Sequence, residues 1–273
     1  MMRLSGLLVA SLLLLLFAGP GLAGEEQEKK HPYREGILRV GPYYLTGIKT
    51  QVQLDDANAP LGTHINFEDE LGLNDSAVVP WMLLDYRFSK RHAIGVKWYQ
   101  LERSGTAFLG RPIQFGDRVI TPGEVDSLID TELLTLEYVW AFYESDQVAL
   151  GLSAGLGVVT IRTGIGTPAE GGAEAFTEKI TIPVPTIGGR FGYKVNRKLS
   201  VLARFDLLNI QYGDFSGSVL DAWFAAEHHT FKHVGFGGSV GRMTMDFEVD
   251  DDQLFWDLSH RYTGVMVHVA VYF

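Results

Sequence analysis

Long segments of this sequence carry apolar side chains at every second position, and short polar turns separate many of these segments. In the final segment, Val265, Val267, Val269, Val271 and Phe273 share one parity. Alternation with a period of two is typical of a β-strand that has one apolar face. Because the pattern recurs along most of the chain, it restricts the fold to an all-β architecture, either a membrane barrel or a secreted soluble barrel.

Ten strands are expected when the connections are used to delimit the segments. The short polar connections lie around residues 89–91, 144–146, 196–198 and 231–233. The longer, more acidic links include 47–74, 107–126 and 164–175. The predicted strands are 37–48, 76–88, 92–106, 127–143, 147–165, 176–195, 199–212, 218–231, 233–249 and 254–273. Eight strands are the alternative, and residues 63–73 could form an extra hairpin within the first long link.

The alternation gives each strand a polar face and an apolar face. In 127–143, Leu134 and Leu136 share one parity, whereas Thr135 and Glu137 share the other. The apolar set is too large for the core of a soluble barrel and the polar set contains mid-strand charges, so we expect the apolar faces to contact lipid. Each segment reaches the ~9–11 residues with which a tilted strand crosses a bilayer. The sequence therefore predicts a transmembrane antiparallel up-and-down β-barrel, closed by pairing of the first strand with the last, with short periplasmic turns and longer extracellular loops.

The first residues predict a secretory signal peptide. Arg3 precedes an apolar run over 7–18, and small residues follow as far as Ala23. A basic start, an apolar stretch and a small-residue cleavage site are the parts of such a peptide. An uncleaved anchor is the alternative, but the run is shorter than the ~20 residues that a spanning helix needs. We therefore expect 1–23 to be removed, 24–36 to be a periplasmic N-terminal segment and 37–273 to form the barrel.

Composition excludes several kinds of site. The chain has no cysteine, which excludes disulfides, a lipid-modified cysteine and cysteine-based zinc sites. Its net charge is −10, and loss of Arg3 with the signal peptide leaves 33 acids against 23 − 1 = 22 bases, or −11. Nucleic acid is not an expected partner, because its binding needs a basic footprint. No cofactor and no metal are expected.

Acidic clusters fall in or beside the expected extracellular loops, at 55–56, 68–70 and 246–252. Clustered carboxylates could bind Ca²⁺ or share the cations that bridge lipopolysaccharide. The sequence has no Asp-x-Asp-x-Asp-Gly loop, however. The preferred interpretation of these clusters is a solvated acidic rim that keeps the loops soluble.

The last strand ends with Val269, Val271 and Phe273 on one face. This ending resembles the C-terminal signal of bacterial outer-membrane β-barrels, which their assembly machinery recognises. The resemblance implies a location in the outer membrane of a Gram-negative bacterium. It also implies the barrel-assembly machinery, periplasmic chaperones, outer-membrane lipids and lipopolysaccharide as partners.

Two shorter stretches carry a more specific resemblance. Residues 183–193 read Pro-x-Pro-x-x-Gly-x-Arg-x-x-Tyr. The region 66–80 contains Phe67, Glu68, Leu71, Gly72, Leu73 and Pro80. Both stretches resemble small OmpW-like outer-membrane proteins. That family has eight strands, and the resemblance implies a role in the passage of small apolar molecules.

Charged residues on the inner faces form the candidate site. The predicted lumen network comprises Asp85, Arg87, Lys97, Glu137, Arg190, Arg204, Asp206, Asp221 and Glu227. Four of them, Glu137, Arg190, Arg204 and Asp206, lie about six to eight residues from a short turn and therefore at similar depth, at ~3.3 Å per residue. An isolated buried charge costs several kcal/mol, so we expect these groups to pair. A structural salt-bridge plug is preferred to a polar path for a solute.

The predicted function is that of an outer-membrane barrel with a narrow or plugged polar lumen, which serves envelope structure or limited passage of small solutes. A surface-interaction barrel that binds a ligand or partner through its acidic loops is the alternative. A rim-sited lipid-modifying enzyme is disfavoured, because the alternation sends His228 and His229 to opposite faces and no Ser is evidently paired with a His. We expect no enzymatic activity.

Overall fold

The computed structural model describes residues 36–56, 64–115, 118–251 and 254–273. The predicted signal peptide and, except for Gly36, the predicted N-terminal segment lie outside the described residues. So does Asp252 of the third acidic cluster.

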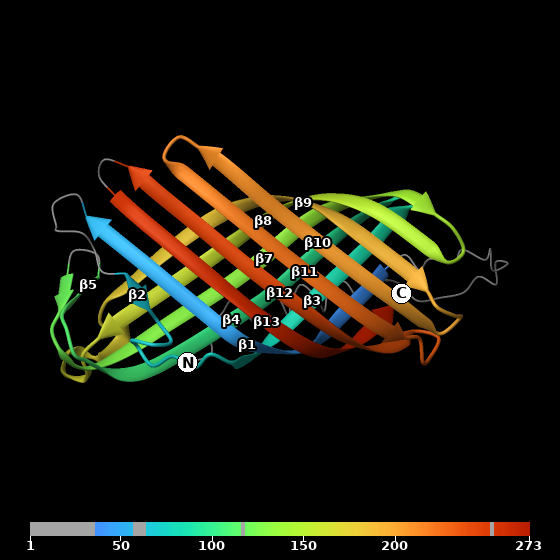
Figure 1. The fold of residues 1–273 in the computed structure, drawn as a ribbon. Coiled ribbons are helices and arrows are strands. Elements are labelled where there is room, and N and C mark those ends of the chain that lie inside the picture. The colour runs from blue at the N-terminus through green and yellow to red at the C-terminus, as the bar shows by residue number, and fades with distance from the viewer. Residues whose placement is uncertain (1–35, 57–63, 116–117, 252–253) are drawn as a thin grey trace, which may run out of the picture. The chain divides into compact units, whose positions relative to one another are not determined.

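Ten long strands follow one another and form one closed antiparallel sheet (Figure 1). They are β1 (Gly36–Asp56), β3 (Ala77–Ser89), β4 (His92–Leu109), β7 (Gly123–Glu144), β8 (Val148–Gly166), β9 (Thr177–Lys194), β10 (Leu199–Tyr212), β11 (Phe215–His228), β12 (Val234–Asp251) and β13 (Leu254–Tyr272). Each strand pairs with its neighbours in this order, and β1 closes the barrel against β13. The predicted ten-stranded barrel is therefore confirmed, and the eight-stranded alternative is wrong.

β1 is longer than predicted, because it continues to Asp56 and does not end near residue 48. The register with β13 shifts between Thr46 and Lys49, and Gly47 between them has φ 60°. A glycine adopts this left-handed conformation without steric cost, so a bulge interrupts the ladder and the strand then resumes. The glycine that marks the start of a loop in the sequence thus lies inside a strand.

Short elements occupy the long links. β2 (Ile65–Asn66) pairs with β1, and β5 (Ile113–Phe115) pairs with β6 (Arg118–Ile120). Two 3₁₀ turns, η1 (Pro168–Glu170) and η2 (Gly172–Glu174), lie between β8 and β9. The extra hairpin predicted within 63–73 is wrong, since β2 is followed there by turns. No helix in the described part of the chain is long and apolar enough to cross a membrane.

The barrel has two unlike ends. We call the end with the short connections 90–91, 145–147, 195–198 and 229–233 the turn end, and the opposite end the loop end. Gly36 and Phe273 lie together at the turn end, where the Gly36 amide donates to the Phe273 carbonyl at 2.8 Å.

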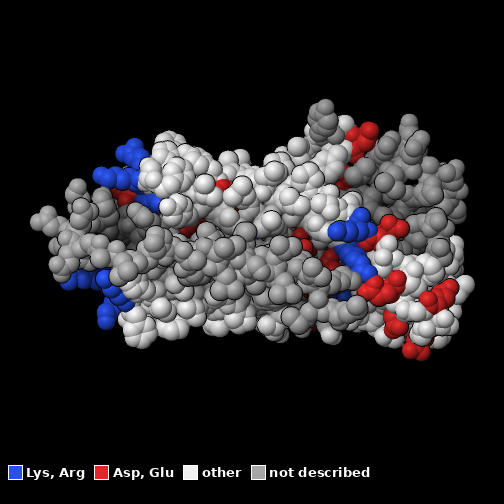
Figure 2. Space-filling view, turned by 180° about the vertical axis from the view of Figure 1, so that it is seen from behind, with Lys and Arg blue, Asp and Glu red and all other residues white. Residues whose placement is uncertain are grey.

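An apolar belt surrounds the part of the barrel next to the turn end. Its exposed side chains include Tyr44, Val78, Ile94, Leu134, Leu136, Leu152, Leu156, Ile187, Phe205, Leu207, Leu220, Phe224, Val240, Val265 and Val267. Five aromatic residues are also exposed at its turn-end margin: Tyr86, Phe88, Phe142, Phe191 and Tyr193. On the face in Figure 2, the charged residues gather toward the two ends. Outward apolar side chains in a band are what a lipid-facing barrel requires.

Beyond the belt the strands continue toward the loop end, and the interior there is an apolar core. Its buried members include Ile48, Val52, Ile65, Phe67, Leu71, Leu73, Leu101, Ile129, Ile161, Ile165, Phe247 and Leu258. Inside the belt, by contrast, the buried set contains Arg39, Glu137, Asp206, Glu227 and His268. The lumen therefore changes from charged to apolar along its length.

Candidate functional site in the lumen

Glycines on neighbouring strands leave room for the lumen carboxylates. Gly95 on β4 and Gly155 on β8 flank Glu137 on β7 in the sheet register. Gly188 on β9 lies opposite Asp206 on β10. A Cβ atom added at Gly95 or Gly188 would come within 2.4 Å or 2.3 Å of a carboxylate oxygen. The small inner residues therefore allow long charged side chains to cross a narrow barrel.

Ion pairs link four strands across the lumen. Arg204 donates to Asp85 at 3.1 Å and also to Glu137. Arg190 donates to Asp206 at 2.7 Å and likewise to Glu137. Glu137 thus accepts from both arginines, and its side chain is only 5% exposed.

Arg39 extends these pairs toward the turn end. Its guanidinium donates to Asp85 at 2.8 Å and to Glu227 at 2.7 Å. Glu227 also accepts from the Tyr272 hydroxyl and lies 3.3 Å from His268 Nε2. The result is a continuous sequence of contacts from Glu227 to Asp206, in which guanidinium groups and carboxylates alternate. We call it the lumen network.

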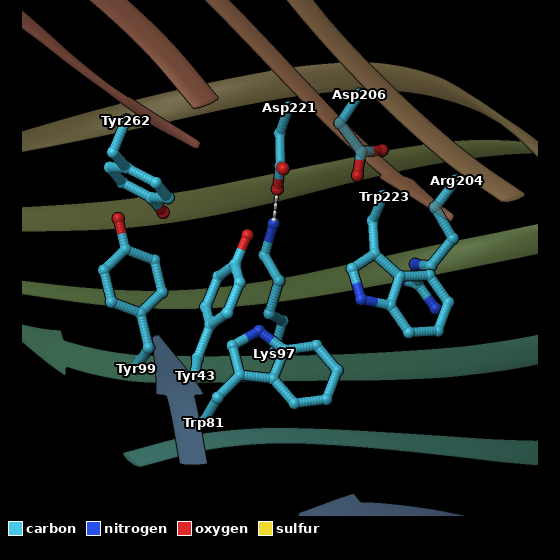
Figure 3. A pocket seen from close by; sticks show the side chains of 9 residues that line it. All are labelled: Tyr43, Trp81, Lys97, Tyr99, Arg204, Asp206, Asp221, Trp223 and Tyr262. Atoms are coloured by element: carbon cyan, nitrogen blue, oxygen red, sulfur yellow. Dashed lines mark hydrogen bonds and ion pairs between the residues drawn. The ribbon is translucent and has the colours of Figure 1, made fainter. Parts of the chain in front are cut away.

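A second polar pair lies beside the lumen network within a group of aromatic rings. Lys97 donates to Asp221, and Figure 3 shows this pair between the rings of opposite walls. Trp81 and Trp223 stack with ring centroids 5.9 Å apart, whereas Tyr262 makes edge contacts with Tyr43 and Tyr99. The rings cover the Lys97–Asp221 pair and fill the width of the barrel at this level.

Two small cavities lie in the lumen. The cavity lined by these aromatic residues, Arg204 and Asp206 has a volume of about 20 Å³. A second cavity, lined by Leu133, Val184 and Met245 among others, also measures about 20 Å³. A water molecule needs about 10–15 Å³ by this measure, so each cavity has room for one water.

The first long link folds back into the barrel near the loop end. We call its residues 65–73 the first-loop plug. Ile65, Phe67, Leu71 and Leu73 in it are all buried in the apolar core. The Phe67 amide donates to the Thr50 carbonyl at 3.0 Å. The plug therefore adds apolar side chains to the lumen that the strands alone do not supply.

A buried polar cluster attaches the first-loop plug to the wall. Arg103 on β4 donates to Glu68 of the plug at 2.6 Å and to the Thr50 hydroxyl at 2.6 Å. The Thr50 amide donates to Glu68 at 2.7 Å. The Thr50 hydroxyl also lies 3.0 Å from Nδ1 of His260 on β13. Arg103 on β4 and the Thr50 amide on β1 thus bind the plug carboxylate directly, and His260 on β13 contacts this cluster through Thr50.

His260 lies beyond the belt, because Val265 is the last exposed apolar residue toward the loop end among the β13 side chains that the structure describes. Its burial, together with the nearby positive charge of Arg103, lowers the pKa of the imidazole to about 3. The ring is therefore neutral at physiological pH, with its Nδ1 within hydrogen-bond distance of the Thr50 hydroxyl. Its Nε2 is buried without a hydrogen-bond partner in the described part of the chain.

Most of the predicted site residues come together in the lumen. Asp85, Glu137, Arg190, Arg204, Asp206 and Glu227 belong to the lumen network, and Lys97 and Asp221 form the neighbouring pair. Arg87 does not join them. It pairs with Glu144 at 3.0 Å at the turn end, where both side chains are about a quarter exposed.

Sequence reasoning missed three residues that take part in the lumen network or in the polar cluster at the first-loop plug: Arg39, Arg103 and His260. Arg39 has the parity opposite to the exposed residues Val40 and Tyr44, so alternation in the first strand indicates its inward position. Arg103 and His260 are buried beyond the belt. Their role depends on the inserted plug, for which the strand pattern carries no signal.

The first-loop acids differ from their predicted role. Glu68 is buried against Arg103, with its side chain 8% exposed, so its assignment to a solvated acidic rim is wrong. Its neighbour Glu70 pairs with Arg111 at 2.6 Å nearer the surface. Among the described residues, no group of three or more His, Asp or Glu side chains is placed to hold a metal ion.

The predicted assembly signal lies at the β1–β13 seam. Val269 and Val271 share the outer face of β13 with the exposed Val267. The Phe273 amide donates to the Gly36 carbonyl at 3.0 Å, and its ring is about half exposed. Val269, Val271 and Phe273 can therefore contact lipid, or a protein that binds the β1–β13 seam from outside the barrel.

Hydroxyl–histidine contacts occur in the interior and at the turn end, where His228 Nδ1 lies 3.1 Å from the Thr230 hydroxyl. Thr50 and His260 are both buried, at 0% and 2% exposure, so a substrate has no access to them. Ser200 Oγ lies 3.3 Å from His229 Nε2 at the turn end. That contact is longer than the ~2.6–3.2 Å expected of a nucleophile and its base.

Comparison with known proteins identifies the fold. No family model and no curated protein matches the sequence. The outer membrane protease OmpT from Escherichia coli has a similar structure, with a TM-score of 0.50 and 8% identity over 87% of this chain and 97% of OmpT. OprG from Pseudomonas aeruginosa gives a TM-score of 0.38 at 12% identity, over 88% of this chain and 96% of OprG. The toluene transporter TbuX from Ralstonia pickettii gives 0.35 at 10% identity, over 88% and 90% of the two chains. The OmpW-like resemblance remains a prediction, and the architecture is that of an outer-membrane β-barrel.

Proposed function

We propose that this chain is an integral outer-membrane protein with a closed lumen, which serves the envelope as a structural barrel and does not conduct. Its turn end faces the periplasm and its loop end faces the medium. The apolar belt and the barrel fold support this location, since both are features of proteins that span the outer membrane.

The observation that carries the proposal is that side chains occupy the lumen at two levels in series, and we propose that each level acts as a seal. The lumen network and its aromatic neighbours fill the barrel within the belt. The first-loop plug fills it nearer the loop end. A solute would have to separate buried ion pairs at the first seal, at ~3–5 kcal/mol for a pair that loses one partner. At the second it would have to displace Phe67 and Leu71, whose burial is worth ~1.5–3 kcal/mol each.

Single-channel recording in planar bilayers tests the proposal. We expect the wild-type protein to be silent. A variant that lacks one seal, either with residues 66–73 replaced by a Gly-Ser linker or with Glu137→Ser, Arg190→Ser and Arg204→Ser, should also stay silent because the other seal remains. The combined variant should conduct. Steady conductance of the wild-type protein would overturn the proposal.

A second function, binding at the cell surface, is favoured because the strands continue well beyond the lipid-facing belt and would carry the loops away from the membrane. β4 pairs with β7 from Trp98↔Leu134, at the belt margin, to Leu109↔Gly123. These 109 − 98 = 11 residues correspond to about 36 Å of strand at ~3.3 Å per residue. Cells that carry the wild-type protein, or a variant with residues 111–121 replaced by a short turn, can be compared on arrays of glycans and matrix proteins. Equal binding by both cell types to every array element would argue against this function.

A further inference from the structure

Three cations stand together on the outer wall, just beyond the apolar belt. Arg261 on β13 lies directly opposite Lys49 on β1. Arg242 on β12 lies opposite Thr263, two residues from Arg261 on the same face of the sheet. All three cations are exposed. Since β1, β13 and β12 are adjacent (Figure 1), the side chains form one patch, which we call the outer cationic patch.

The outer cationic patch has no ion-pair partner in the part of the chain that the structure describes: no carboxylate there forms an ion pair with Lys49, Arg242 or Arg261. Like charges directly opposite each other in an antiparallel sheet repel. Arg162 on β8, also on the outer wall, is by contrast paired with Asp130 and Glu174.

The position of the patch defines the chemistry of its ligand. Tyr44, Val265 and Val240 lie opposite one another in a row across the same three strands, and all three are exposed in the belt. Arg242 follows Val240 by two residues, which is about 6–7 Å along a strand. A ligand that covers both the apolar row and the cations must have apolar chains on the turn-end side and negative charge on the loop-end side. The acids Asp246 and Asp257 lie farther toward the loop end and oppose movement of an anion beyond the patch.

We infer that Lys49, Arg242 and Arg261 bind the phosphate groups of a phosphorylated glycolipid of the outer leaflet, whose acyl chains lie on Tyr44, Val265 and Val240. Arginine and lysine are suited to phosphate, and arginine binds its oxygens in a bidentate manner. The apolar row distinguishes a lipid from free phosphate. The inference rests on the proposed outer-membrane location for the presence of the lipid, but not on the closed lumen.

Native mass spectrometry of the purified, delipidated protein tests the inference directly. The probes are diphosphorylated lipid A and the same lipid with both phosphates removed. We expect the phosphorylated form to bind, and the variant Lys49→Gln, Arg242→Gln, Arg261→Gln to lose at least tenfold in affinity. The matched control Lys90→Gln, Arg91→Gln, Lys198→Gln removes the same charge from exposed turn-end positions and should bind as the wild type does.

Three results would contradict the inference: equal binding of both lipids, unchanged binding by the patch variant, or equal losses in the patch and control variants. A shift in gel mobility on heating shows that each variant is folded before it is measured. Binding is measured on purified protein, so a failure to bind lipid counts against this inference alone. The proposed function would instead be contradicted by conductance of the wild-type protein or by a location outside the outer membrane.

Discussion

Glu137 lies directly across from Gly95, and a methyl group on Gly95 would come within 2.4 Å of the Glu137 carboxylate. The two positions are therefore coupled, since the carboxylate reaches Arg190 and Arg204 only because Gly95 has no side chain. Strand alternation places both on the inner face, but the closeness of the contact is a property of the closed barrel.

Gly95→Ala should move Glu137 and weaken both of its ion pairs. We expect a loss of about 1–3 kcal/mol in the free energy of unfolding, as is typical of overpacking. Gly189→Ala is the matched control, because no heavy atom lies within 4 Å of its added methyl group. Urea titration in detergent measures both variants, and equal stabilities would show that Glu137 is not confined.

Arg204→Met should lower the free energy of unfolding by up to ~3–5 kcal/mol, because Asp85 and Glu137 each lose one of their two arginine partners inside the barrel. Arg204 forms ion pairs with Asp85 and Glu137, whereas Asp206 forms its ion pair with Arg190. Adding Glu137→Gln should therefore restore more stability than adding Asp206→Asn. Equal restoration by the two changes would contradict the pairing, and an unchanged melting temperature for Arg204→Met would contradict a sealed lumen.

Arg103→Met should release the first-loop plug, since Glu68 then loses its only ion pair among those described. Amide hydrogens of residues 65–73 should exchange faster, while those of the belt strands are unchanged. Arg111→Met is the control: its pair with Glu70 is much more exposed, and such pairs contribute only ~0–1 kcal/mol. Slow exchange of the plug in Arg103→Met would show that apolar packing alone retains it.

Acid should weaken the attachment of β13 to the plug. The imidazole of His260 has a pKa of about 3 in the folded protein and 6.5 as its ordinary value. Between these values the unfolded state binds more protons, so the stability contributed by neutral His260 falls as the pH falls below 6.5. Melting curves of the wild type and His260→Gln should therefore approach each other from about pH 8 to about pH 5. A constant difference between the two proteins would refute this assignment.

Deletion of Phe273 should impair assembly, because it removes the last residue that pairs with Gly36 and the aromatic ring at the edge. We expect less heat-modifiable protein in the membrane fraction. Phe273→Tyr, which keeps the ring, is the control. Normal yield of the deletion variant would show that the terminal residue is dispensable.

The strands were predictable because alternation is local, whereas the pairings in the lumen were not. The parity of Glu137 follows from Leu136 and Tyr138 beside it. Its contact with Arg204 depends instead on how β7 and β10 face each other across a closed barrel, which no neighbouring residue encodes. The first-loop plug was missed because Phe67, Leu71 and Leu73 share one parity, as in a strand, so the pattern does not reveal that these residues are buried in a non-strand segment inside the barrel.

The seam between β1 and β13 has a consequence for biogenesis. β1 obtains one of its two partners from the last residues of the chain, with Ile37 opposite Tyr272. Until translation and export of β13 are complete, β1 is an unpaired edge, and such an edge templates association with other chains. Contacts between residues so distant in sequence also form slowly. We therefore expect the β1 edge to need protection for the whole interval before the two ends meet, and truncation before β13 to yield an aggregation-prone product rather than a smaller barrel.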